Sequence, residues 1–175
     1  TPHLTKSRMI VHAVELIKRQ PILPDVWKLE APGRIQHMTE ETVTALTALA
    51  PKDVFLRDPS TALRAESQAE SRDSGFRGQV NEARIRQALA AFSVEAQDEA
   101  IGYLTGLYAM VRATLPTGRP VLLLTAGVPD VQFAIQYTLI TRFGGKALSL
   151  VSQTGDGAFV GHLAGRSVWR AQVRL

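Results

Sequence analysis

Cysteine is absent from this chain of 175 residues. Without it the protein cannot form disulfides, use a thiol nucleophile or bind a metal through cysteine. Long apolar runs are absent too, since no stretch approaches the roughly 20 residues that cross a bilayer. The opening TPHLTKSR lacks the apolar centre of a secretory signal. We therefore expect no membrane partner and a cytoplasmic protein.

Motifs of well-known enzyme and nucleotide-binding classes are also missing. The sequence has no signature of a kinase, a P-loop protein, a Rossmann dehydrogenase, an α/β-hydrolase, a zinc deaminase or an RRM domain. The histidines are far apart and show neither HxH nor HExxH spacing: His3, His12, His37 and His162. We therefore expect no metal site and no cofactor.

Ser152, Asp156 and His162 have the residue types of a catalytic triad. A two-residue Asp-Gly turn would place Val151 opposite His162, so Ser152 would point to the other face of the hairpin. A three-residue loop would change this register. With the two-residue turn, His162 shares a face with Trp169 and is expected to be a packed core histidine. We expect no triad here.

The composition that is present is globular, with a basic excess. Hydrophobic residues make up 45% of the chain, and 20 Lys and Arg face 16 Asp and Glu, a net charge of +4. This length fits a single domain, 1–175. The segment at about 59–79 is rich in Ser, Ala, Glu, Arg and Gln, so we expect a mobile connection or a solvated helix there.

The first two thirds of the chain predict four helices, near 5–20, 40–50, 81–92 and 93–115. Each begins at a residue that can cap it: Thr5, Thr39, Asn81 and Ser93. Pro51 is expected to end the second helix, and a short strand is expected within 51–59. Residues 26–38 predict a β-hairpin that turns at Pro32-Gly33 and places Trp27 and His37 on one face.

The C-terminal part predicts a strand (121–124), a helix (129–143), a strand (147–152), an Asp-Gly turn at Asp156-Gly157 and then two closing strands. A right-handed crossover would make the first two of these strands parallel neighbours. We therefore expect an α+β (mixed α/β) fold. Its helical N-terminal part would pack on a sheet formed mainly by this C-terminal β-α-β-β-β unit.

The turn TAGVPD joins an expected strand to a helix, where free backbone N–H groups can meet an anion. Thr125 and Gly127 are the candidate anion-binding residues. Pro129 removes one donor, and Asp130 already sits where it offsets the helix dipole. An ordinary, self-capped turn is the alternative, so any anion binding is expected to be weak.

The last expected strand gives the main functional candidate. Arg166, Arg170 and Arg174 recur at even spacing and share one face, and a short hairpin loop would add Phe159 to it. Arginines beside an aromatic ring can hold a nucleic-acid backbone and stack a base. The alternative is an edge strand whose charges prevent further strand pairing.

Gly102 and Gly106 form a GxxxG pattern in the fourth expected helix. We interpret this helix as amphipathic, with Ile101, Leu104 and Tyr108 among its core residues. The two glycines then allow close packing on another element, and a helix-mediated homodimer is the alternative.

Three functions remain open at this point. The first is a non-catalytic binding module that contacts nucleic acid, or a protein partner in a nucleic-acid-handling assembly. The second is an enzyme whose site gathers residues from distant segments: Glu30, His37, Asp53, Asp58 and Asp130. The third is an oligomerising structural domain of a longer protein, a hypothesis prompted by the missing initiator methionine. The binding module is the interpretation we favour.

Overall fold

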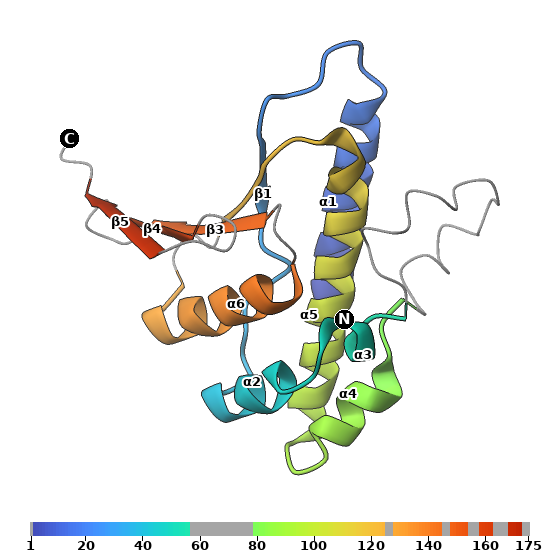
Figure 1. The fold of residues 1–175 in the computed structure, drawn as a ribbon, viewed down its shortest axis with the longest axis vertical. Helices are drawn as coiled ribbons and strands as arrows, with labels where there is room; N and C mark the ends of the chain where they lie inside the picture. Colours follow the sequence, from blue (N-terminus) through green and yellow to red (C-terminus); the bar gives the residue numbers. More distant parts are fainter. Residues whose placement is uncertain are drawn as a thin grey trace.

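The computed structural model describes residues 2–56, 79–124, 128–144, 148–153, 158–162 and 168–172, with side chains from Thr5 to Gly144 within these ranges. Helices and strands alternate irregularly along it (Figure 1). The elements in chain order are α1 (Pro2–Lys18), β1 (Trp27–Glu30), α2 (Glu40–Thr47), α3 (Pro51–Val54), α4 (Glu82–Ala88), α5 (Val94–Thr114), the 3-10 turn η2 (Leu115–Thr117), β2 (Val121–Leu124), α6 (Asp130–Phe143), β3 (Leu148–Gln153), β4 (Ala158–His162) and β5 (Val168–Gln172).

Helix α5 lies at the centre of the molecule. It packs beside α1 along the long axis (Figure 1) and also contacts α4 and α6. Every residue from Glu99 to Val111 is buried, including the predicted core residues Ile101, Leu104 and Tyr108. The predicted core positions are therefore confirmed. The expectation of an amphipathic helix is wrong, because neighbours cover this stretch of α5 on all sides.

Gly106 explains how closely α1 approaches α5. A Cβ atom added at Gly106 would collide with the hydroxyl oxygen of Ser7 on α1 and lie 3.3 Å from the Pro32 Cβ. A side chain at this position would push the two helices apart. The close packing predicted from the GxxxG pattern is confirmed for Gly106, whose side of the helix is filled by α1.

Local capping follows the sequence in three of four cases. Three of the predicted caps accept a hydrogen bond from a backbone N–H group in the first turn of their helix: Thr39, Asn81 and Ser93. Thr5 does not cap a helix, because α1 already begins at Pro2, where a proline loses no helical hydrogen bond. Pro51 does not end α2, which stops at Thr47, and instead begins α3.

The predicted hairpin at 26–38 is wrong. β1 pairs in parallel with β2, Trp27 opposite Val121, and residues 34–38 form no strand. The backbone N–H groups of Gln36, His37 and Met38 instead donate to the carboxylate of Glu99, each at 2.8 Å. A buried carboxylate is a stronger acceptor than a strand carbonyl, so it holds this segment away from β1.

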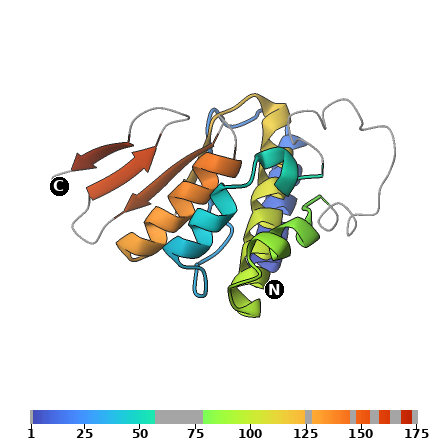
Figure 2. The same ribbon diagram turned by 60° about the horizontal axis from the view of Figure 1, so that its bottom comes forward.

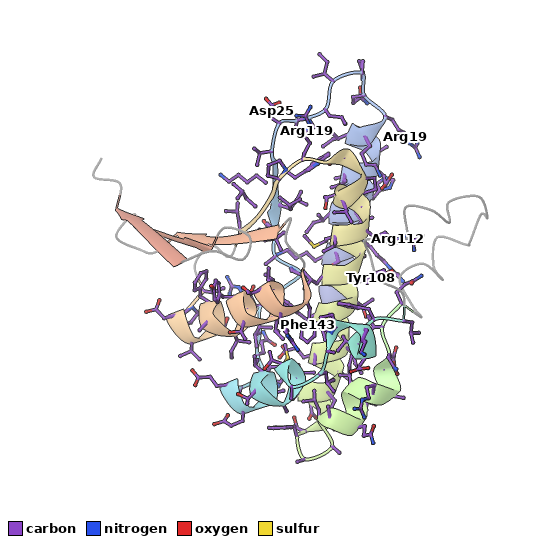
Figure 3. All side chains as sticks on the ribbon, viewed as in Figure 1. Arg19, Asp25, Tyr108, Arg112, Arg119 and Phe143 are labelled. Atoms are coloured by element: carbon purple, nitrogen blue, oxygen red, sulfur yellow. The ribbon has the colours of Figure 1, made fainter. Side chains whose placement is uncertain are left out.

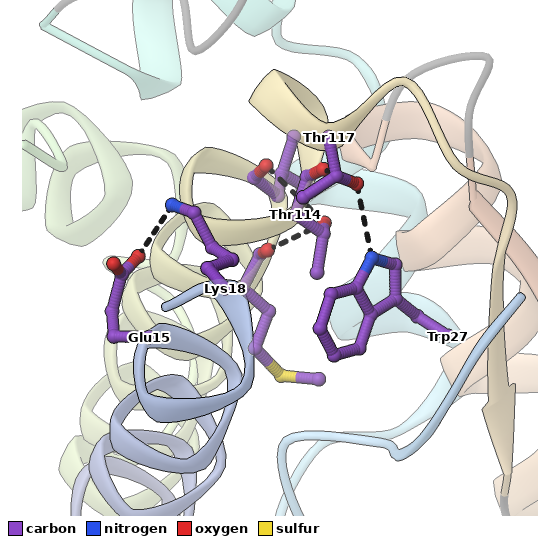
Figure 4. A network of polar contacts seen from close by, with 7 residues as sticks. Glu15, Lys18, Trp27, Thr114 and Thr117 are labelled. Atoms are coloured by element: carbon purple, nitrogen blue, oxygen red, sulfur yellow. Dashed lines mark hydrogen bonds and ion pairs between the residues drawn. The ribbon is translucent and has the colours of Figure 1, made fainter. Parts of the chain in front are cut away.

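Trp27 fixes the start of β1 to the end of α5. Its indole Nε1 donates to Thr117 Oγ1 at 3.0 Å, and Thr117 Oγ1 donates to the Thr114 carbonyl at 2.6 Å (Figure 4). The ring itself is buried. The two ends of a 90-residue connection are thereby held together where the parallel pair begins.

The core continues through α3 and α6. Phe55 forms a single antiparallel bridge with Val80 in place of the expected short strand. The centre of its ring lies 5.3 Å from the centre of the Tyr108 ring and 6.1 Å, edge-on, from the centre of the Phe143 ring. The predicted connection at 59–79 lies outside the described residues except for Gln79, which is buried and accepts a hydrogen bond from Tyr108.

The fold therefore mixes helices with strands, as the sequence predicts, whereas the parallel pair of β1 and β2 was not expected. α6 lies beside α2 (Figure 2), and Arg142 of α6 donates to the Leu49 carbonyl at 3.0 Å. The backbone continues with β3 parallel to β2 and with antiparallel β4 and β5. The packing of a complete β-α-β-β-β unit stays a prediction, because the side chains from 145 onward lie outside the described residues.

None of the helices in the described ranges has the length and apolar composition needed to cross a bilayer.

Candidate functional site

The residues considered for a dispersed enzyme site lie on separate elements. Glu30 ends β1 and forms an ion pair with Lys6 of α1 at 2.5 Å. Asp53 lies in α3, Asp130 begins α6 and His37 is an exposed loop residue, whereas Asp58 is outside the described ranges. Over the described part of the chain, no three acidic or histidine side chains gather as they would around a metal ion.

A buried polar contact joins α5 to α6, and the sequence did not reveal it. The Tyr103 hydroxyl donates to Gln136 Oε1 at 3.2 Å, and both residues are buried. Burial raises the pKa of the Tyr103 phenol above its usual value, so the hydroxyl stays protonated. Within the described residues, Gln136 Nε2 and Gln132 Oε1 have no hydrogen-bond partner. The contact orients α6 against α5.

The turn before α6 is only partly described. Thr125 and Gly127, the predicted anion-binding residues, lie outside the described ranges. Pro129 precedes the first turn of α6 without a side-chain cap, and Asp130 occupies that first turn as expected. The carboxylate thus occupies the electropositive end of the helix dipole. Whether this turn binds an anion stays a prediction.

The C-terminal arginines are described only through the backbone of β5. Arg170 lies in this strand, while Arg166 and Arg174 are outside the described residues. Phe159 pairs with Ala171, and Val160 pairs with Arg170. Positions 159 and 170 therefore belong to opposite faces of the sheet, and the predicted Phe159–arginine face is wrong in this register.

The predicted register of the preceding hairpin is also wrong. Leu150, and not Val151, lies opposite His162, and Ser152 lies opposite Val160. The single-residue difference moves Ser152 to the face of His162 and separates His162 from Trp169, which pairs with Gly161. Asp156 lies outside the described residues, so the expectation that these three residues form no triad stays a prediction.

Charge is distributed unevenly over the described residues. We call residues 2–38 and 112–119 the basic side, because they carry eight Lys and Arg and only three Asp and Glu. Residues 39–56, 79–99 and 128–144 form the acidic side, with four Lys and Arg and eight Asp and Glu. The net charge of the whole chain conceals this separation.

The charges of the basic side are mostly accessible. Lys28, Arg34 and Arg119 are exposed, and the guanidinium of Arg119 lies 3.7 Å from Asp25, too far for a strong pair (Figure 3). Arg19 at the end of α1 has no ion-pair partner among the described residues. These groups remain available to bind an anionic ligand.

Exposed apolar side chains gather on the same side. Eight large apolar residues are exposed in the described part of the chain, and five of them lie within 9–26: Met9, Leu16, Ile17, Ile22 and Val26. The sequence analysis did not identify these exposed side chains, because their exposure depends on which elements cover α1. One signal was available, since Met9, Ala13 and Leu16 lie on a different side of the helix from Val14.

This chain matches no protein-family model, no curated protein and no solved structure. Its function must be inferred from its own residues and geometry.

Proposed function

We propose that this chain is a non-catalytic module that binds nucleic acid, as an accessory component of a nucleic-acid-handling assembly. The observation that supports the proposal is the excess of Lys and Arg in the residue ranges of the basic side and the opposite balance in those of the acidic side. Surface charge acts over a Debye length of about 10 Å at moderate salt, so a polyanion is attracted to one side and repelled by the other. This separation would orient the nucleic acid before any close contact forms.

The basic residues along the parallel strand pair would make the first contacts. Lys28 lies in β1, Arg34 follows this strand, and Arg119 precedes β2. All three are exposed, so each can neutralise a phosphate without disturbing the core. Phosphate contacts of this kind give affinity and position but little sequence preference.

The C-terminal arginines form the second part of the proposal. We infer that β3, β4 and β5 complete a β-α-β-β-β unit with α6, on which the helical part packs. β5 is the last strand in the sheet order, so Arg170 lies on an edge strand. Arg166, Arg170 and Arg174 recur every four residues, about 13 Å along a strand. This spacing would let each arginine contact a different phosphate.

Three triple variants with the same change in charge test the proposal. The first removes the basic side: Lys28→Ala, Arg34→Ala and Arg119→Ala. The second removes the C-terminal arginines: Arg166→Ala, Arg170→Ala and Arg174→Ala. The matched control is on the acidic side: Lys52→Ala, Arg84→Ala and Arg86→Ala. Binding of a labelled single-stranded oligonucleotide is measured by fluorescence anisotropy over a series of salt concentrations.

Each lost phosphate contact lowers the slope of log K against log salt by about 0.7 for a single strand. We expect the first two variants each to lower the slope by about two units, and the control to leave it unchanged. No binding by the wild-type protein at low salt would contradict the proposal. So would a control variant that binds as weakly as the other two, because the effect would then depend on net charge alone.

A further inference from the structure

The outer face of α1 carries an apolar stripe that nothing in the described chain covers. Met9, Ala13 and Leu16 follow one another at spacings of four and three residues, which places them in one row along the helix. Met9 is 70% exposed and Leu16 46%. Ile22, in the loop after α1, is 82% exposed and lies beyond the end of the helix.

The opposite face of α1 is already occupied. Ser7 and Val14 are buried, and α1 packs mainly on α5 (Figure 1). The stripe therefore does not result from a helix that is loose or turned the wrong way. It is a second apolar face on a helix whose first face is held in the core.

Basic groups border the stripe. His12 and Arg19 follow one edge of it, and neither has an ion-pair or hydrogen-bond partner for its side chain in the described residues. Lys6 lies on the other edge, paired with Glu30. An apolar row bordered by the Arg19 guanidinium and by an imidazole that can donate a hydrogen bond is complementary to an apolar row bordered by carboxylates.

We propose that the outer face of α1 docks an acidic amphipathic helix of a protein partner. The row from Met9 to Leu16 covers two helical turns, about 10.5 Å. A partner helix of three to four turns, with apolar residues at matching spacing, would cover it. Glutamates on the flanks of that helix would lie beside Arg19 and His12. This surface is separate from the phosphate contacts of the proposed function.

Two other occupants fit the stripe less well. A second copy of the chain would bring the same cationic edges together, and like charges at an interface oppose association. Helices that bind a membrane surface have a broad apolar face, which often includes aromatic residues, and a polar face that stays in water. α1 contains no Phe, Trp or Tyr, and its other long face is packed on α5.

The test uses two synthetic helical peptides, stapled so that both are folded. One has leucines at spacings of four and three residues with glutamates on both flanks, and the other has the same leucines with lysines. The protein variant is Met9→Gln with Leu16→Gln. The matched control is Val94→Gln with Val131→Gln, which removes two equally exposed apolar side chains from other helices. Binding is measured by anisotropy of the labelled peptide.

We expect the acidic peptide to bind at least ten times more tightly than the lysine peptide, and the α1 variant to lose at least ten-fold in affinity. The control variant should change affinity by less than two-fold, and the α1 variant should keep the nucleic-acid salt slope of the wild type. Equal binding of the two peptides, or an equal loss in the control variant, would overturn the proposal. Stripe-dependent dimerisation in sedimentation, or stripe-dependent binding to phosphatidylserine vesicles without a peptide preference, would assign the face to those occupants instead.

Discussion

Two helices that lie side by side, α1 and α5, differ in how much of their surface the neighbouring elements bury. α5 contacts α1, α4 and α6 and is buried on every side between Glu99 and Val111. α1 packs mainly on α5 and exposes Met9 and Leu16. Both helices carry apolar residues on more than one side, so composition alone does not decide burial. The neighbouring elements decide it, and α1, whose main neighbour is α5, leaves Met9 and Leu16 exposed.

The buried polar groups of the two helices differ in the same way. On α5, Tyr103 bonds to Gln136, Tyr108 to Gln79 and Thr105 to the Ile101 carbonyl. On α1, the buried Ser7 hydroxyl has no hydrogen-bond partner in the described part of the chain. Buried hydroxyls with partners help to specify one packing arrangement, whereas an unpaired one costs free energy. α5 is therefore the better determined of the two helices.

The largest effect is expected from truncating one leucine on each helix. Leu104 of α5 is fully buried, so Leu104→Ala should lower the free energy of unfolding by about 3–5 kcal/mol through lost burial and a residual cavity. Leu16→Ala on α1 removes the same atoms from a half-exposed side chain and should cost less than about 1 kcal/mol. Urea denaturation of both variants measures the difference. Equal losses would mean that α1 is covered in solution.

The second largest effect is expected from removing the carboxylate of Glu99, at the start of the buried stretch of α5. Glu99→Ala removes the acceptor of three backbone N–H groups and should lower the free energy of unfolding by about 2–4 kcal/mol. Hydrogen exchange should rise at residues 36–38, which lose their acceptor. Glu95→Ala, one turn earlier and exposed, is the control and should change neither quantity. Unchanged protection at 36–38 in the Glu99 variant would contradict this role.

Sequence reasoning found the features that depend on near neighbours. Thr39, Asn81 and Ser93 were predicted as caps because a cap and the N–H group that it accepts are three residues apart. The β2 strand was also found, since its apolar run lies between prolines and a turn. These local patterns, with the expected mix of helix and parallel strands, were enough to predict the coarse fold.

The features that were missed depend on residues far apart in the chain. The predicted hairpin at 26–38 has good turn residues, but β1 instead pairs with β2, about 90 residues later in the chain. The segment that was expected to pair with β1, residues 34–38, donates hydrogen bonds to the Glu99 carboxylate. One signal for the burial of α5 was present: residues 100–111 contain no charged side chain. A helix that is apolar all round is typically a central helix. The proposed docking face of α1 gave no such signal, because it depends on which face of this helix the other elements leave uncovered.

The smallest effect is expected from removing the Tyr103 hydroxyl of α5. It tests whether the hydrogen bond of this hydroxyl is shielded from solvent. Tyr103→Phe removes the hydrogen bond to Gln136 and should cost about 1 kcal/mol at neutral pH. Burial raises the pKa of Tyr103 in the folded state, whereas in the unfolded chain the phenol ionises near pH 10. The stability that depends on the protonated hydroxyl is therefore present below about pH 10 and is lost as the pH rises, by about 1.4 kcal/mol per pH unit. The phenylalanine variant lacks this loss, so the two unfolding free energies should become equal near about pH 11. Denaturation series from neutral to alkaline pH measure this convergence, and curves that stay parallel would show that Tyr103 is not shielded from solvent.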